Sequence, residues 1–280
     1  MRVGQAAIAL LAAAAIAWSA AKPAAAGDSG VPILLYHRFN PSRAAAPTVV
    51  TTPVFERQLN WLADHGYKVA RLGAVVEALR GGAPIEPRTV VITADDGRRS
   101  QYTDMYPIIL RHGTPVTLFV YTHAISAEQD ALTWEQIDEM ARSGLIDVQS
   151  HTYTHPHFAR ERARRRPADF AAFVVAELQG SKATIEERLK RPVKYLAWPY
   201  GSDAADLERA ASAAGYCAAF VVAGRRARAG DDPFAMPRIV VRNADVGERF
   251  DRLLNLGGPQ LAAAAEPPAS CAATSETPPR

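Results

Sequence analysis

The sequence has few cysteines, little net charge and no apolar run long enough to span a membrane. Cys217 and Cys271 are the only cysteines among its 280 residues, and they suggest neither a disulfide framework nor a cysteine-based zinc site. The formal net charge of +3 is too small to indicate nucleic acid as a partner. Residues 6–17 are apolar, but a spanning helix needs about 20 such residues. No internal repeat is present either, which excludes a repeat architecture.

Residues 1–26 have the pattern of a secretory signal. They begin with a charged residue, continue with the short apolar run and end in three alanines that suit cleavage. We expect the mature chain to be secreted or periplasmic, without stable membrane insertion; an uncleaved N-terminal anchor is the alternative. Residues 27–257 predict one domain, and residues 258–280 predict a disordered tail because Ala, Pro, Ser and Thr dominate them.

Strand-like and helix-like segments alternate along the mature chain. The strands are expected at residues 31–36, 67–70, 89–94, 115–121, 145–149, 193–197, 217–222 and 237–241. The helices are expected at residues 52–65, 72–79, 102–111, 133–143, 168–189, 203–214 and 246–256, with caps from Thr133 with Gln136 and from Asp203. An alternation of about seven or eight such units predicts a parallel α/β barrel, in which chemistry lies at the C-terminal ends of the strands.

One strand ends on two adjacent carboxylates. The apolar run of residues 89–94 is followed by Asp95, Asp96 and a glycine. Two neighbouring carboxylates repel each other unless a cation or a proton lies between them, although Asp and Gly are also common in simple turns. His151 and His155 follow another predicted strand. One carboxylate oxygen and two imidazole nitrogens suit Zn²⁺, Co²⁺ or Ni²⁺ better than Ca²⁺, so a divalent metal site is predicted.

Three stretches carry a resemblance to a known family. Residues 93–97 (TADDG) resemble the T-F-D-D-G motif of the NodB-type polysaccharide deacetylases, carbohydrate esterase family four. Residues 151–155 (HTYTH) resemble their H-[ST]-x-x-H motif, and residues 198–201 (WPYG) resemble the end of R-x-P-[YFW]-G. The motifs come in the family's order, within a core of about residues 88–243. The resemblance implies an irregular (β/α) barrel of the NodB homology type in a single domain.

The resemblance also implies roles for the polar residues. The metal falls to Asp96, His151 and His155, and Asp95 becomes the general base toward water. The backbone N–H of Tyr200 is then the donor that stabilises the oxyanion of the acetamide.

Two further roles concern the acid and the substrate. The pair Tyr36 and His37 resembles the branch that acts on poly-N-acetylglucosamine, where the histidine is the general acid. Trp198, Pro199 and Tyr200 are assigned to the substrate wall, with core packing as the alternative for the aromatic rings. His123 is a weaker candidate for substrate contact.

The sequence departs from the family pattern at three places. Ala197 stands where the family's base-orienting arginine is expected, and Arg238 or Arg242 is a candidate replacement. Ala94 replaces the usual phenylalanine before the Asp pair. No match to the family's late L-x-H motif is found, which favours His37 as the acid. The very basic residues 160–166 indicate either a guide for an anionic polymer or a solvated charged face.

The leading hypothesis is therefore a metal-dependent hydrolase that removes N-acetyl groups from an amino-sugar polysaccharide. The candidate substrates are poly-N-acetylglucosamine, a chitin-like polymer and the glycan of peptidoglycan. The alternatives are a non-catalytic glycan-binding protein of the same fold and a metal-dependent esterase or amidase with another acyl substrate. The sequence leaves the oligomeric state open.

Overall fold

The computed structural model describes residues 30–81, 84–201 and 203–256, and seven parallel strands of this part close into a barrel. The strands are β1 (Ile33–Tyr36), β5 (Thr89–Asp95), β6 (Val116–Val120), β7 (Ile146–Ser150), β8 (Tyr195–Ala197), β9 (Ala218–Val222) and β10 (Met236–Val240). β4 (Lys68–Val69) pairs with the first residues of β5. The predicted signal and tail lie outside the described residues.

Closure of the barrel depends on β1, which pairs with two strands from opposite ends of the chain. Leu34 is in register with Ile92 of β5 and with Ile239 of β10. All four residues of β1 are buried, as expected for a strand covered on both faces. The barrel is the fold class that the sequence predicted, and its solved neighbours described below share it.

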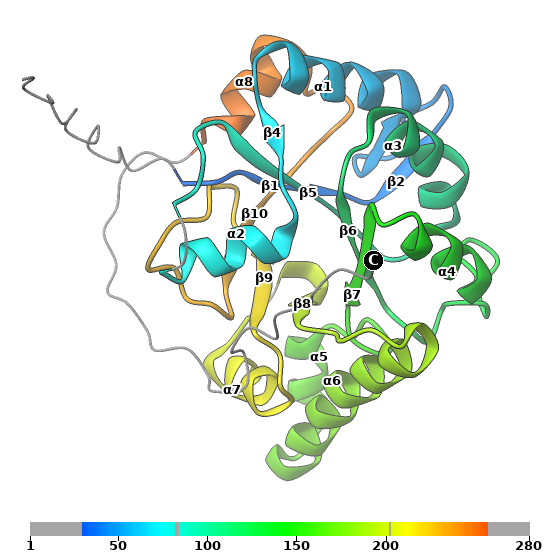
Figure 1. Cartoon of the computed structure of the whole chain (residues 1–280). Helices are drawn as coiled ribbons and strands as arrows, with labels where there is room; N and C mark the ends of the chain where they lie inside the picture. The colour runs from blue at the N-terminus through cyan, green and yellow to red at the C-terminus, as the bar shows by residue number, and fades with distance from the viewer. Residues whose placement is uncertain (1–29, 82–83, 202, 257–280) are drawn as a thin grey trace, which may run out of the picture.

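Helices surround the strands (Figure 1). They are α1 (Thr52–Asp64), α2 (Leu72–Leu79), α3 (Tyr106–His112), α4 (Trp134–Arg142), α5 (Phe158–Arg164), α6 (Pro167–Leu189), α7 (Ala205–Ala213) and α8 (Glu248–Leu254). α8 lies beside α1, where the rings of Phe250 and Trp61 are 5.6 Å apart. A separate pair, β2 (Arg38–Asn40) and β3 (Val49–Thr51), follows β1. Among the described residues, no helix has both the length and the apolar character required to cross a membrane.

The helix starts test two of the sequence predictions. Thr133 and Gln136 form the expected capping box of α4, each side chain bonding the other residue's backbone N–H. The cap predicted at Asp203 is wrong. The helix begins later, with Ala204 as its N-cap and no capping side chain.

The segment after the Asp pair is not a continuous α-helix. Gln101–Met105 form a π-helical turn, and α3 follows it. Pro107 has no N–H for the preceding turn and its ring crowds the carbonyl four residues earlier. The wider π turn accommodates that defect, and such turns are frequent at functional sites.

Cys217 requires a second correction. It lies just before β9 and is disulfide-bonded, whereas no disulfide was expected from the sequence pattern.

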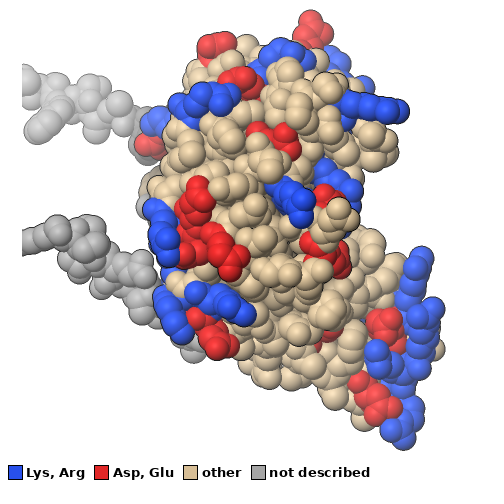
Figure 2. Space-filling model, turned by 90° about the vertical axis from the view of Figure 1, so that its right-hand side faces the viewer, with Lys and Arg blue, Asp and Glu red and all other residues tan. Residues whose placement is uncertain are grey.

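The basic residues 160–166 form α5 and the turn into α6. Arg162 makes a two-pronged pair with Asp206, and Arg166 pairs in the same way with Asp169. Figure 2 shows a face on which basic and acidic side chains are interspersed, with basic ones gathered at the lower right. The ion pairs fit the solvated charged face better than a binding site for an anionic polymer.

The side chain of Gln149 supplements the pairing between β7 and β8, which has the fewest register pairs in the barrel. β7 and β8 have one register pair, Ser150 with Leu196. The buried Gln149 side chain accepts the backbone N–H groups of Lys194 and Tyr195, each at 2.9 Å. It therefore replaces two missing hydrogen bonds of the sheet immediately before His151.

We expect Gln149→Met to lower the free energy of unfolding by several kcal/mol. The methionine has a similar volume but no acceptor, and each buried N–H left without a partner costs about 1–3 kcal/mol. Urea denaturation followed by circular dichroism measures the change. Gln179→Met, at an exposed position of α6, is the control and should shift the midpoint little; equal midpoints for both variants would contradict this role of Gln149.

Candidate active site and metal centre

The predicted site residues lie where strands end. Asp95 is the last residue of β5 and Asp96 follows it, His37 follows β1, and His151 follows β7. A pocket of about 300 Å³ opens at this end of the barrel. Its lining includes His37, Arg38, Asp95, Asp96, His151, His155, Trp198, Tyr200 and Arg238. The expectation that His37, Asp95, Asp96, His151 and Tyr200 meet at the C-terminal ends of the strands is confirmed.

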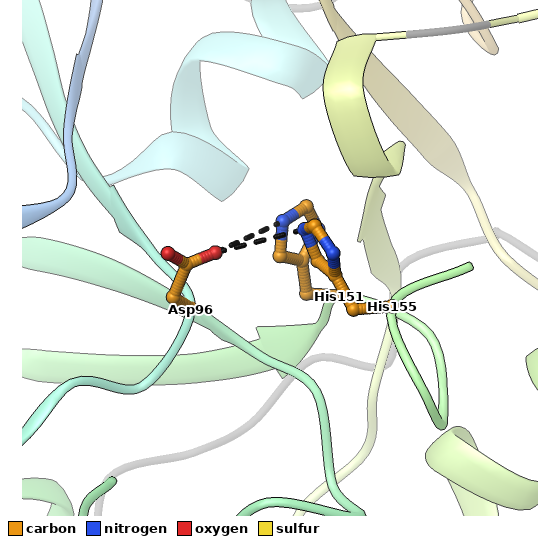
Figure 3. Close-up of side chains that lie close together, drawn as sticks. All are labelled: Asp96, His151 and His155. Carbon is orange, nitrogen blue, oxygen red and sulfur yellow. Dashed lines mark ion pairs between the residues drawn. The ribbon is translucent and has the colours of Figure 1, made fainter. Parts of the chain in front are cut away.

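Asp96, His151 and His155 present three ligand atoms to one point (Figure 3). Asp96 Oδ1 lies 3.7 Å from Nε2 of each histidine. These separations are too long for hydrogen bonds. Bonds of about 2.0–2.2 Å at the tetrahedral angle would place two zinc ligands about 3.4 Å apart. The geometry and the donor set therefore fit a divalent metal ion.

Both imidazoles are held in the form that binds a metal. The ring nitrogen Nδ1 of His151 lies 2.7 Å from the carbonyl oxygen of Ala197. Donation there leaves the lone pair of Nε2 facing Asp96. Burial, and then the neighbouring His151, lower the pKa of His155 to about 4. His155 is therefore neutral near pH 7, as a ligand must be.

Asp95 is tied to an arginine from the far end of the chain. The guanidinium of Arg238, on β10, donates to both carboxylate oxygens of Asp95 at 2.7 Å. Both side chains are buried, with 0% and 3% exposure. Arg242 is exposed, and its backbone N–H bonds Asp245 instead. Of the two arginines considered as replacements at the base, Arg238 occupies that position.

The pKa of Asp95 reflects opposing influences. Burial is the largest single influence and raises the pKa. The charges of Arg238 and His151 and the hydrogen bonds from Arg238 lower it, and together they outweigh burial. The net effect holds the pKa below its usual range. Asp95 is therefore ionised at neutral pH and available to accept a proton.

His37 lines the same pocket as His151 and His155. Burial is the main influence and lowers its pKa, while the negative charges of Asp95 and Asp96 act against it. Among the described residues, none offers a hydrogen-bond partner to its buried Nδ1. Burial therefore disfavours the charged imidazolium form of His37.

Residues 198–200 divide between core and pocket. Trp198 is fully buried, its Nε1–H donates to the carbonyl of Phe234, and its ring meets Phe158 edge to face. The ring of Trp198 packs in the core, as in the alternative considered for it, although Trp198 also contributes to the pocket lining. Pro199 is buried as well. Tyr200 is 64% exposed, and its ring lies 4.8 Å from that of His155.

Unusual backbone angles concentrate at the site. Asp96, Thr152, His155 and Tyr200 have φ values of 80°, 68°, 60° and 59°. A positive φ is uncommon outside glycine, and for a β-branched residue such as Thr152 it is a genuine outlier. Strain of this kind persists only where surrounding contacts enforce it, and it clusters at functional sites.

Two residues of the site escaped the sequence prediction. Gln101, in the π turn, donates through Nε2 to the carbonyls of His37 and Asp95, at 2.8 and 2.6 Å. It therefore fixes the ends of β1 and β5 relative to each other. Arg98 Nε lies 3.3 Å from Asp96 Oδ2, which leaves Oδ1 for the histidines. The only available signal was their closeness to the Asp pair in the sequence.

A larger cavity, of about 670 Å³, lies elsewhere. Its lining comes from the N-terminal ends of β6, β7 and β8, including Val116, Ile146 and Tyr195. In barrels of this kind chemistry belongs to the opposite face, and Asp96, His151 and His155 are not in its lining. We therefore assign the site to the smaller pocket.

Comparisons with known proteins relate the chain to polysaccharide deacetylases. A family model described as polysaccharide deacetylase matches residues 82–219. The chain is 35% identical over 119 residues to the poly-β-1,6-N-acetyl-D-glucosamine N-deacetylase of Escherichia coli K12, covering 37% of this chain and only 18% of that protein. It is 24% identical over 220 residues to the protein of the same name from Staphylococcus aureus strain MRSA252, covering 77% and 74%.

A solved structure shares the fold. IcaB from Ammonifex degensii superimposes with a TM-score of 0.72 at 25% identity, covering 81% of this chain and 97% of that one.

We expect the protein to bind one divalent ion per chain through the three facing ligands. His155→Ala should weaken binding of Zn²⁺ or Co²⁺ by more than about 100-fold, because loss of a ligand exceeds the 10–100-fold effect of its outer partners. Isothermal titration of chelator-treated protein measures this. His123→Ala removes an exposed histidine and should leave the affinity unchanged; tight binding in both variants would place the ion elsewhere.

Proposed function

We propose that this chain, which carries a polysaccharide deacetylase domain at residues 82–219, hydrolyses N-acetyl groups of an amino-sugar polysaccharide. The observation that carries the proposal is the juxtaposition of two differently paired carboxylates. Asp95 is bound by Arg238, and Asp96 faces two histidines. A protein that only binds glycans has no need of an ionised base beside a set of metal ligands.

Asp96, His151 and His155 would hold the metal, and zinc is the ion we propose, with cobalt and nickel as substitutes. When bound, such an ion polarises a carbonyl and acidifies water. The residues fit it because their nitrogen and oxygen atoms already face one another within 4.8 Å. Arg98 restrains the other oxygen of Asp96.

Asp95 accepts the proton of the attacking water in this proposal. Its ionised state is maintained by the two-pronged bond from Arg238, which also fixes the orientation of the carboxylate. His37 is the proposed proton donor to the departing amine. Burial lowers its pKa and disfavours the protonated form that this step requires, and the charges of Asp95 and Asp96 oppose that effect only in part.

The exposed ring of Tyr200 supports a polymer substrate. Tyr200 lines the pocket together with Arg38, Ala46, Thr48 and Val222. A flat aromatic face offers apolar surface to a sugar ring. We propose a β-1,6-linked N-acetylglucosamine polymer, the substrate in the names of the two relatives, met outside the cytoplasm if residues 1–26 direct export.

We expect acetate release from N-acetylglucosamine oligomers, faster for β-1,6 than for β-1,4 linkages. Chelator should abolish it, Zn²⁺ or Co²⁺ should restore it, and Asp95→Asn should lower it by about 10²–10⁴-fold, the usual contribution of a general base. Enzymatic acetate detection measures the rate. Metal binding without release from any oligomer would favour the glycan-binding alternative, and release only from small acetyl esters would favour the esterase.

Arg238→Gln should move the acid limb of the kcat/KM pH profile to higher pH. Loss of the guanidinium charge raises the pKa of Asp95, and the base works only when ionised, so activity is lost earlier as pH falls. At neutral pH we expect a drop of roughly 10- to 100-fold, part of the general-base contribution.

Arg242→Gln is the matched control and should leave the profile unchanged, since Arg242 is exposed. Thermal unfolding verifies that Arg238→Gln is folded at the assay temperature. A folded Arg238→Gln with the wild-type profile would contradict the role of Arg238.

A further inference from the structure

The loop that carries both histidines is docked on one face of helix α6. We propose that Glu177 and Ser181 of this helix are positioning residues that hold residues 151–155 in the ligand geometry. The inference rests on the proposed function and extends it to residues that lie outside the family motifs.

Glu177 bonds the loop through three donors. Its Oε2 accepts the backbone N–H groups of Tyr153 and Thr154, at 3.0 and 2.8 Å. Its Oε1 accepts the hydroxyl of Thr154 at 2.6 Å. The residue is 4% exposed, and within the described residues no Lys, Arg or His forms an ion pair with it. Among the described residues, the donors to this carboxylate all belong to the histidine loop.

Ser181, one helical turn later, holds the start of the same loop. Its hydroxyl is 2.9 Å from that of Ser150, and Ser150 Oγ accepts the N–H of Thr152 at 3.2 Å. Between them, Gly180 lies beside the ring of Tyr153. A Cβ at that position would be 3.6 Å from the ring, an ordinary van der Waals contact. Positions 177, 180 and 181 therefore form one docking face for residues 150–154.

The loop needs such support because its backbone is strained. Thr152 and His155 both have positive φ, 68° and 60°. These angles turn Nε2 of His155 toward Asp96, as Figure 3 shows. A loop without external hydrogen bonds would relax toward ordinary angles and carry His155 away from the other ligands. Glu177 thus acts on the metal through the loop, without touching it.

Metal affinity and amide exchange test the role of Glu177 directly. Glu177→Gln keeps the volume but replaces one acceptor oxygen by an NH₂ group. We expect it to weaken Co²⁺ and Zn²⁺ binding by about 10- to 100-fold, measured by competition with a chelator. In the metal-free protein, hydrogen exchange of the peptide containing Tyr153 and Thr154 should accelerate. Ser181→Ala should weaken binding several-fold.

Glu187→Gln, at an exposed position of the same helix, is the matched control and should change neither readout. Unaltered affinity and exchange in a folded Glu177→Gln, with metal bound by the wild type, would overturn this inference and leave the proposed function intact. Absence of metal binding by the wild type would overturn the metal-dependent function and, with it, the role given to Glu177. Equal weakening in Glu187→Gln would attribute the effect to helix charge and overturn the docking role.

Discussion

Two adjacent carboxylates at the buried end of one strand set the constraint that organises this protein. Asp95 and Asp96 cannot share an apolar environment as free anions, since burial disfavours the charged form. The fold separates their surroundings. Arg238 pairs with Asp95 inside the barrel, whereas Asp96 faces the imidazoles of His151 and His155 and contacts Arg98. This separation suits the proposed function, in which one carboxylate accepts a proton and the other binds a cation.

That separation depends on closure of the barrel. Asp95 stands at the end of β5 and Arg238 on β10, and the two strands are neighbours only through β1 between them. Removing one partner of a buried ion pair typically costs about 3–5 kcal/mol. The pair between Asp95 and Arg238 therefore also stabilises the closed barrel. Gln101 adds a second tie, because it bonds the carbonyls at the ends of β1 and β5. The catalytic arrangement and the barrel are therefore stabilised by the same contacts.

Sequence patterns predicted the parts of this structure that local chemistry determines. The buried strands, α2 and the capping box of α4 follow from periodicity and from short-range hydrogen bonding. The Asp pair and the two histidines were visible because their types and spacing are themselves the signal. Contacts between distant segments had no such signal. Glu177 sits in an ordinary helical stretch, the choice between Arg238 and Arg242 depends on register across the barrel, and the burial of Trp198 depends on Phe158 and Phe234.

Ala197 stands where the family pattern has an arginine, and its backbone and its side chain have separate roles. Its carbonyl fixes the tautomer of His151, a service that any residue provides. Its methyl group belongs to the same buried cluster as Phe119, and the guanidinium of Arg238 lies 5.3 Å above the ring of Phe119. A small residue at 197 leaves this interior volume to an arginine that enters from β10. The base therefore keeps its guanidinium partner although the expected position holds alanine, because the barrel interior can be reached from several strands.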